Sequence, residues 1–356
     1  MSKNAIVTVT AINQALSLEV RPFNSALLIT KTLDIKSDSN LPITITSASQ
    51  LLESYPSDLT VDSPEYVMAK DFFLAEPKPT RLFVYGELSG NYTDILMGLN
   101  TRWAKQWFVT MPVDSTVASM KEVFDFIDGS SNEYVVVFQS AANVTIADNI
   151  ANVKQYPRPK GYYVAADVDE KQAANLVGTK IELFPGSSPW STTQLTGMTG
   201  STYDETEKLE LVGVNENSAT GINICTIEDT LPVVYYGKSM DGTTWFDYVL
   251  AKIAVDEYMR VGIFKYMITK NTTSKIPANA IGRSQIAAEG MRILQEFVDR
   301  EIIYGQGDFD DEGNPLLDVN VISLTNRTVE LEYICTYQGA IIKARININL
   351  SSIDGN

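Results

Sequence analysis

Both ends of this chain carry the alternation of apolar and polar residues that is typical of a half-buried β-strand. Near the carboxyl end, residues 329–337 alternate, a turn at Gln338-Gly339 follows, and a second alternating stretch runs to Leu350. Near the amino end, the same period covers residues 5–10 and 16–21. A period of two residues indicates a strand with one buried face. Because most domains fray at their termini, strands at both ends constrain the fold strongly.

The terminal strands allow two interpretations. They can pair inside their own domain, which is the commoner arrangement, or they can be arms that pair with other copies of the chain. An arm would form backbone hydrogen bonds with the sheet of a neighbouring copy and would place its apolar side chains against that copy. The candidate residues for strand donation between subunits are Ala5, Val7, Val9, Leu16, Leu18, Val20, Ile342, Ala344, Ile346, Ile348 and Leu350. From the residues alone, both interpretations stay open.

Length and composition predict a protein with a substantial core. A chain of 356 residues, 44% of them hydrophobic, is expected to form two domains. The chain has no run of eighteen apolar residues, so we expect no membrane span. The opening Met-Ser-Lys-Asn lacks the pattern of a signal peptide, so we expect a protein made and kept in a cytosol. Cys225 and Cys335 have no metal-binding or redox spacing and are expected to be buried small hydrophobes.

The charge excludes one class of function. The formal net charge is −16, from 44 acidic and 28 basic residues. Phosphate backbones require a basic protein face, so this chain is not expected to bind nucleic acid. Such a surface also repels its own copies. Any contact between copies should therefore depend on geometry and backbone pairing more than on bulk charge.

The chain contains no histidine, which removes the commonest general base and metal ligand. Catalysis by serine–histidine or cysteine–histidine pairs is excluded. The acidic loop at residues 308–312 does not have the spacing of an EF-hand and is expected to be solvated. The glycines at 86 and 90 follow a strand but lack the spacing of a phosphate-binding loop. We expect no catalytic, cofactor or metal site.

The first two thirds of the chain alternate strands with helices. The expected strands lie at 25–30, 81–85, 106–110, 134–138 and 161–165, and the expected helices at 47–55, 63–73, 92–103, 115–126, 146–153 and 170–176. This order predicts an α/β layer with a largely parallel sheet. A turn-rich segment at 184–197 follows, and two further strands are expected near 222–227 and 233–236.

The last third has a different pattern. A long helical pattern covers residues 245–269, and after a loop at 270–279 a second helix is expected to reach Tyr304, with Gly305 as its cap. Together with the final hairpin, these helices predict a separate α+β unit. The basic residues concentrate here, at Lys270, Lys275, Arg283, Arg292 and Arg300. Such a set is commonly a solvated helix face, and it can also contact an acidic partner.

The order of several motifs resembles the contractile-tail sheath proteins of bacteriophages, tailocins and related injection systems. The motifs are Phe72-Phe73, residues 77–84, residues 184–190 with Leu195 and Gly197, residues 213–215, residues 242–247, and the two long helices before a hairpin containing Gly339-Ala340. The resemblance runs from about Arg21 to Leu350.

This resemblance implies an outer mixed α/β region and an inner domain of two helices and antiparallel strands, with extended β arms at both ends. The implied boundaries are 1–20 for the first arm, 21–240 for the outer region, 241–340 for the inner domain and 341–356 for the second arm. It also implies a structural virion protein without enzymatic activity.

The resemblance further implies how the protein acts. Subunits would polymerise as six-fold rings stacked helically around a tail tube, and contraction would drive the tube through the host cell envelope. The partners would be other copies, the tube protein, and the baseplate and tail terminator proteins, with assembly in the host bacterial cytoplasm. Lys270, Lys275, Arg283 and Arg292 are the candidate tube contacts.

Two alternatives come from other classes of protein. One is a histidine-free α/β enzyme that uses carboxylate or lysine chemistry. The other is a different tail or baseplate protein, and the long helices of residues 245–304 argue against a small β-dominated tube protein.

Overall fold

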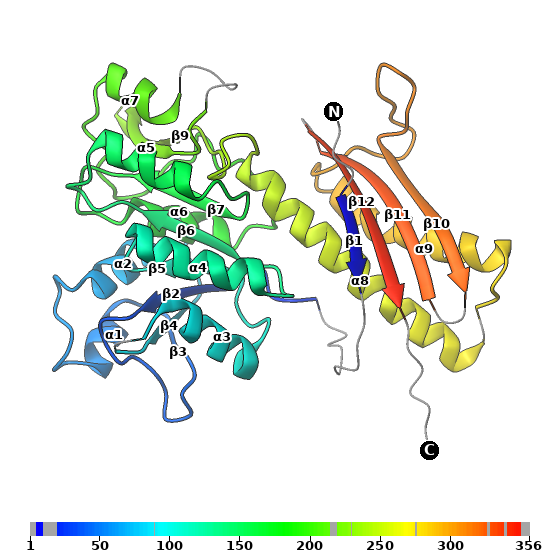
Figure 1. Ribbon diagram of the computed structural model, residues 1–356, viewed down its shortest axis with the longest axis horizontal. Helices are drawn as coiled ribbons and strands as arrows, with labels where there is room; N and C mark the ends of the chain where they lie inside the picture. The colour runs from blue at the N-terminus through cyan, green and yellow to red at the C-terminus, as the bar shows by residue number, and fades with distance from the viewer. Residues whose placement is uncertain are drawn as a thin grey trace. The chain divides into compact units, whose positions relative to one another are not determined.

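The computed structural model describes residues 5–9, 20–88, 90–213, 219–228, 230–274, 276–325, 328–337 and 340–349. The chain divides into two compact units, one formed by residues 21–249 and the other by residues 1–20 and 250–356 (Figure 1). The predicted mixed α/β architecture, with a large and mostly parallel sheet and a separate antiparallel one, is confirmed. No described helix combines the length and the apolar character that crossing a membrane requires.

An eight-stranded sheet forms the centre of the larger unit. Its strands are β2 (Ala26–Thr30), β3 (Ile43–Ile45), β4 (Leu82–Gly86), β5 (Val109–Pro112), β6 (Val135–Gln139), β7 (Gly161–Ala165), β8 (Asn223–Glu228) and β9 (Leu231–Tyr235). Their order is β3-β4-β2-β5-β6-β7-β8-β9, and only the edge strands β3 and β9 pair antiparallel to their neighbours. The residues of β2, β4, β5, β6 and β7 are all buried. Burial of both faces explains why these strands are continuous apolar runs.

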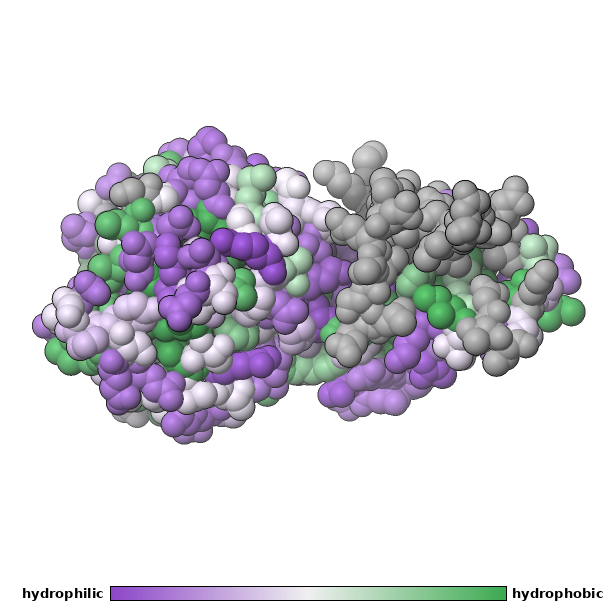
Figure 2. All heavy atoms as spheres, turned by 90° about the horizontal axis from the view of Figure 1, so that it is seen from below, coloured by the Kyte–Doolittle hydropathy of each residue, from purple (hydrophilic) through white to green (hydrophobic). Residues whose placement is uncertain are grey.

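Helices cover both faces of this sheet. They are α1 (Ser49–Ser54), α2 (Pro64–Phe73), α3 (Tyr92–Trp103), α4 (Val117–Gly129), α5 (Ile146–Gln155), α6 (Gln172–Ile181) and α7 (Glu205–Val212). Helices α3, α4, α5 and α7 share one hydrophobic cluster with inward residues of the strands, such as Leu27 and Phe138. Helix α2 packs against α6 on the other face. The face of this unit seen in Figure 2 is largely hydrophilic with small hydrophobic areas between, as expected for an acidic surface.

One edge of the large sheet is short and the other is covered. Strand β3 is three residues long, and a short segment at 192–195 pairs with the outer edge of β9 through an isolated bridge and backbone hydrogen bonds. Short or covered edges are the usual way in which proteins prevent their sheets from pairing with other chains.

The smaller unit combines a four-stranded sheet with two long helices. Its strands are β1 (Ala5–Val9), β10 (Leu317–Thr325), β11 (Thr328–Tyr337) and β12 (Ala340–Asn349), in the order β1-β12-β11-β10. Helix α8 (Phe246–Thr273) begins in the larger unit, and α9 (Ala280–Val298) follows it. Alternate residues of β11, such as Val329, Leu331 and Tyr333, are buried, whereas Glu330 and Glu332 are half-buried. One sheet face therefore packs on the helices, as the alternation predicts.

Several element boundaries differ from the prediction. Helix α9 ends at Val298 with Asp299 as its C-cap, so Gly305 does not cap it. Helix α8 continues to Thr273 into the expected loop. Three elements, β3, α7 and β10, were not predicted from the sequence, although Leu317, Val319 and Val321 of β10 alternate as buried residues.

Candidate functional site

The sheet of the smaller unit is built from the two ends of the chain. Strand β12 lies between β1 and β11 (Figure 1). Its pairing with β1 is parallel and runs from Ala5 opposite Ala344 to Val9 opposite Ile348. Its pairing with β11 is antiparallel and includes Tyr333 opposite Ala344. In this single chain the two terminal strands thus pair with each other, and β12 also pairs with β11 of the same chain.

The candidate residues for strand donation fall into three groups. Seven lie in the paired strands, namely Ala5, Val7 and Val9 in β1 and Ile342, Ala344, Ile346 and Ile348 in β12. Val20 is described, half-buried and outside any strand. Leu16, Leu18 and Leu350 lie outside the described residues. A single chain does not test donation to a neighbour, which stays a prediction.

Strand β11 is fixed to helix α8 by a polar contact. The buried hydroxyl of Tyr333 donates a hydrogen bond to a carboxylate oxygen of Asp256, whose other oxygen accepts from the Lys252 ammonium at 2.8 Å. Burial, and then the negative charge of Asp256, raise the pKa of Tyr333 well above its usual value. The hydroxyl therefore stays protonated and donates. This contact links β11 to α8 and does not depend on which strand pairs with the edge of β11.

The two long helices pack closely and leave a groove. A methyl group placed on Gly262 of α8 would lie 2.5 Å from Cδ1 of Ile293 on α9, so the absence of a side chain permits the contact. A cavity of about 340 Å³ opens on the helix pair. Its lining residues are Val20, Tyr258, Val261, Gly262, Lys265, Arg292, Ile293 and Glu296. Because cations and an anion both line it, the groove carries no strong charge of one sign.

The structure separates the candidate tube-contact residues. Lys270 is exposed near the end of α8, with its ammonium 5.8 Å from the ring centre of Tyr266, and Arg283 is exposed near the start of α9. Both lie close to the connection between the two helices. Arg292 lies further along α9, where its guanidinium is 2.7 Å from Oε1 of Glu289. Lys275 lies outside the described residues.

The apolar neighbours of these cations were not singled out from the sequence. Ile268 near the end of α8 and Ile281 near the start of α9 are 41% and 63% exposed. Ile268 lies two residues from Lys270 and Ile281 two residues from Arg283, so each isoleucine shares a helix end with a basic residue but points to a different side of the helix. Ile281 directly follows the first residue of α9, and only the helix boundary reveals that it points away from the core.

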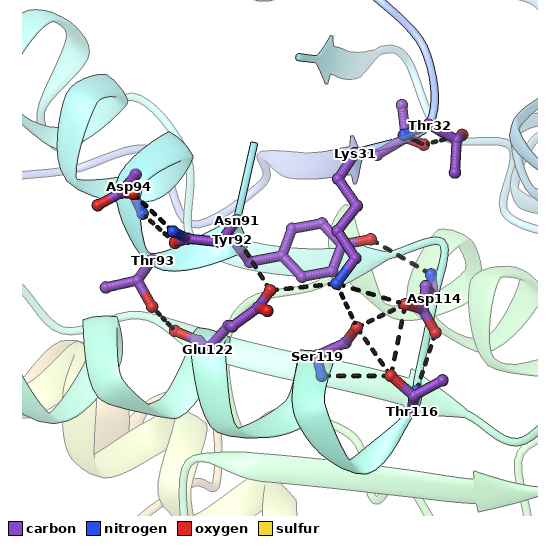
Figure 3. Close-up of polar contacts among 11 residues, drawn as sticks. Lys31, Thr32, Asn91, Tyr92, Thr93, Asp94, Asp114, Thr116, Ser119 and Glu122 are labelled. Atoms are coloured by element: carbon purple, nitrogen blue, oxygen red, sulfur yellow. Dashed lines mark hydrogen bonds and ion pairs between the residues drawn. The ribbon is translucent and has the colours of Figure 1, made fainter. Parts of the chain in front are cut away.

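A second candidate site lies where the larger sheet reverses its strand order. From β2 the chain adds β4 on one side and then β5 on the other, and ligands of open α/β sheets bind at such a point. Here the Lys31 ammonium fills the position (Figure 3). It lies 2.9 Å from Oγ of Ser119, 3.2 Å from Oε2 of Glu122 and 3.6 Å from Oδ2 of Asp114, and it faces the ring of Tyr92 at 4.9 Å.

The protein's own side chains occupy the places that an anionic ligand would take. Asp114 accepts from the backbone N–H of Thr116 at 2.9 Å, at the start of α4, and also from the hydroxyl of Ser119 (Figure 3). Glu122 accepts from the backbone N–H of Tyr92 at 3.1 Å. A helix N-terminus is where α/β proteins commonly bind phosphate. Asp114 accepts from the N–H of the N-cap residue Thr116, and the Thr116 side chain accepts from the N–H of Ser119, so side chains of the protein already bind these donors at the start of α4.

Two other groups considered from the sequence have structural roles. Asp310 accepts from the backbone N–H groups of Glu312 and Asn314 at 3.0 and 2.8 Å and so closes the acidic turn. In the described part of the chain, no group of three or more histidine, cysteine, aspartate or glutamate side chains could hold a metal ion. Cys225 and Cys335 are buried as predicted, and burial raises the pKa of each thiol to about 12, which makes both unreactive.

Sequence comparison finds no match, whereas structural comparison finds proteins of similar fold. No protein-family model and no curated protein matches the chain. The fold is similar to a sheath tail protein from Listeria innocua, with a TM-score of 0.64 and 10% identity over 92% of this chain and 96% of that one. It is similar to a sheath tail protein from Desulfitobacterium hafniense, with a TM-score of 0.61 and 10% identity over 96% and 100%.

A third solved structure is a helical sheath in its contracted state, from the anti-feeding prophage. The similarity has a TM-score of 0.58 and 12% identity, and it covers 98% of this chain and 97% of that one. Each of the three similarities covers nearly the full length of both proteins compared, so it includes both units of this chain. The chain therefore has the fold of sheath tail proteins.

Proposed function

We propose that this chain is the subunit of a contractile tail sheath, in which copies stack as six-fold rings around a tail tube and contract to drive it through the host envelope. The similarity to three sheath proteins, one of them a contracted helical sheath, supports the proposal. The observation that carries it is the sheet in which both chain ends lie side by side.

This sheet is suited to strand exchange between copies. Strand β12 is held by backbone pairing to β11 along its whole length and to β1 at its other edge. A second copy offers the same β11 edge in the same register, so an exchanged β12 would recover every main-chain hydrogen bond. An element at a chain end can swap without threading the chain. The intramolecular pairing thus defines both the donor and the acceptor of the proposed exchange.

Exchange at both chain ends would link many copies into one assembly. A copy that donates a terminal strand to one neighbour and accepts a strand from another makes a head-to-tail contact. Such a contact generates rings or helices, depending on its rotation. The formal charge of −16 opposes association through unspecific surfaces, and main-chain pairing does not depend on side-chain charge. The short edge of β3 and the covered edge of β9 support the smaller unit as the place where strands would be exchanged.

Contraction would then preserve the strand network while the larger units rearrange. A sheath that shortens must change how its subunits pack without losing the links between them. Strands paired by many backbone hydrogen bonds would be the permanent links, and packing contacts between the bodies would be replaced. This is a switch between two packings of one assembly. It requires no bound nucleotide, because the extended assembly stores the free energy that contraction releases.

The connection between α8 and α9 is the proposed contact with the tube. Lys270 and Arg283 are exposed there together with Ile268 and Ile281. A tube surface with acidic and apolar groups would complement them. Arg292, already neutralised by Glu289, would contribute less. Partners at the ends of the sheath would be baseplate and terminator proteins, and the protein would belong to the tail of a virion or related particle.

Electron microscopy of the purified protein tests this proposal. Negatively stained samples of the full chain should contain striated or hollow cylinders with six-fold rings. Variants that cannot pair β12 should remain soluble and form none. A full chain that stays monomeric at high concentration, both alone and with its tube protein, would contradict the proposal.

A further inference from the structure

A cavity of about 450 Å³ opens at the carboxyl ends of β5, β6 and β7 in the larger unit, where these strands are parallel neighbours. Its walls come from the segments that follow β5 and β6, from α5, and from Lys171, which directly precedes α6. Asp114 belongs to the wall but Lys31 does not, so the cavity lies beside the cluster of Figure 3. Open α/β sheets commonly bind ligands at this end of their strands, and the volume suits a small molecule.

Buried amide side chains hold the walls of this cavity in place. Gln139, at the end of β6, accepts from the N–H of Ala173 at 2.9 Å and so fixes the start of α6. Asn149 of α5 donates to the carbonyl of Val144 at 3.2 Å and accepts from the hydroxyl of Tyr163 at 2.8 Å. The cavity is therefore preformed, because these buried groups make their hydrogen bonds to the protein itself.

Three charged side chains line the cavity, and two of them have partners within the protein. The carboxylate of Asp114 lies 3.6 Å from the Lys31 ammonium, and that of Asp148 accepts from the hydroxyl of Thr145 at 2.7 Å. The third is Lys171, which is half-buried. Its ammonium makes no hydrogen bond and no ion pair with any residue that the structure describes. The cavity thus presents one cation whose charge no protein group neutralises by contact.

The surroundings of Lys171 favour an added anion. Burial lowers the pKa of its ammonium, although the more distant charges of Asp169 and Asp71 act in the opposite direction. A partly buried cation without a counter-ion is penalised by the loss of hydration, and a bound anion would offset that penalty. Carboxylate and phosphate groups are the anions that form charge-assisted hydrogen bonds with an ammonium.

The wall opposite this cation is polar and uncharged for the most part. Asn143 precedes α5, and Asn152 lies on it; both line the cavity, together with Asp148. An amide side chain both donates and accepts hydrogen bonds, which suits the hydroxyl groups of a ligand. A molecule that carries hydroxyl groups and one anionic end would therefore match both sides of the cavity.

We propose that this cavity is a binding site for a small hydroxylated oxyanion, which places its carboxylate or phosphate against Lys171 and its hydroxyl groups against the polar side chains of α5 and the segment before it. The site belongs to the larger unit alone. The inference goes beyond the proposed sheath function and does not depend on it.

Protection of Lys171 from reductive methylation tests the proposal in the full chain. Methylation of each lysine is followed by mass spectrometry without ligand and with about 10 mM glucose, gluconate or glucose 6-phosphate. For a site with a Kd of about 1 mM, occupancy at about 10 mM slows the reaction at Lys171 about tenfold. The internal control is Lys154, which is exposed on α5 and does not line the cavity. Gluconate and glucose 6-phosphate represent the two kinds of oxyanion, and glucose has the hydroxyl groups without the charge.

The expected result is slower methylation of Lys171 with at least one oxyanion, little change with glucose, and no change at Lys154. Whichever oxyanion protects more strongly identifies the anionic group that the site prefers. The proposal is overturned if neither oxyanion slows the reaction at Lys171, if glucose slows it equally, or if Lys154 is slowed to the same extent.

Thermal unfolding of two lysine variants provides a second readout. Lys171→Met keeps the backbone N–H that donates to Asp71 at 2.7 Å, so the start of α6 should fold as before. The oxyanion that protects Lys171 should raise the Tm of the unmodified chain and of Lys154→Met by about 3–5 °C at about 10 mM. The Tm of Lys171→Met should not rise. An equal rise in all three proteins would show a general effect of the salt and would refute a site at Lys171.

Discussion

Replacement of Gly178 by alanine should destabilise the larger unit, because α2 and α6 approach each other there too closely for a side chain. A methyl group on Gly178 would overlap the carbonyl oxygen of Phe72 and lie 2.8 Å from Cβ of Ala75. A backbone carbonyl cannot rotate away, so the helices must separate. Overpacking of this kind costs about 1–3 kcal/mol, and alanine recovers about 1 kcal/mol of helix propensity. The net loss of stability should be about 1 kcal/mol, within a range of about 0–2 kcal/mol.

Gly129→Ala is the matched control in the same unit. Gly129 is the last residue of α4, and a methyl group placed there would meet nothing within 4 Å. This variant should be neutral or more stable by up to about 1 kcal/mol. For a unit of this size the two variants should differ in Tm by about 4–8 °C, measured by calorimetry or by circular dichroism. Equal Tm values would refute the argument that backbone contact decides the cost.

Three further predictions concern the ends of the chain, its pH dependence and its partner. A chain truncated after Gln338 should be soluble and largely folded but unable to polymerise; cylinders formed by it in electron micrographs would contradict the assignment of the second arm. Burial raises the pKa of Asp247 from 3.8 to about 6, so the folded state binds this proton more tightly than the unfolded state does, and the stabilisation is present at low pH and lost as the pH rises from about 4 to 6. The free energy of unfolding of the Asp247→Asn variant should therefore fall less over this range than that of the unmodified chain, by up to about 3 kcal/mol. Denaturation at several pH values measures it, and an equal fall in both proteins would show that Asp247 does not carry the effect. Reversal of the charges of Lys270 and Arg283 to glutamate should weaken cosedimentation with tubes more than self-assembly, whereas Lys121→Glu, on the exposed side of α4, should change neither; the opposite order would exclude a basic tube contact.

The sequence predicted best those elements whose pattern depends on neighbours along the chain. The bounds expected for the strand at 161–165 and the helix at 92–103 are those of β7 and α3. Buried strands between helices are short apolar runs, and these need no tertiary information to be recognised. Helix α7 was missed because its buried residues, Leu211 and Val212, lie together at its end and form no stripe.

Features that depend on strand order could not be predicted. Lys31, Asp114 and Glu122 come together because β2 and β5 are neighbours, and nothing local links residues separated by about ninety positions. The pairing of Arg292 with Glu289 was visible in principle, since residues three apart on a helix are neighbours. Thr336 was expected on the outer face of its strand, yet it is 6% exposed. Its backbone carbonyl accepts from the N–H of Tyr304, so the segment after α9 pairs with the edge of this end of the strand.

Disulfide trapping of the terminal strands tests strand exchange most directly. In the register of β1 and β12, Ala5 lies opposite Ala344, so cysteines at both positions can form a bond across the two strands. The native thiols are buried and unreactive and should not interfere. The account predicts that assembled Ala5→Cys/Ala344→Cys protein, once oxidised, runs as a ladder of covalent multimers in a denaturing gel without reductant, whereas a Val9→Cys/Ala344→Cys control out of register does not. Oxidised cylinders that release only monomers with an internal disulfide would contradict it.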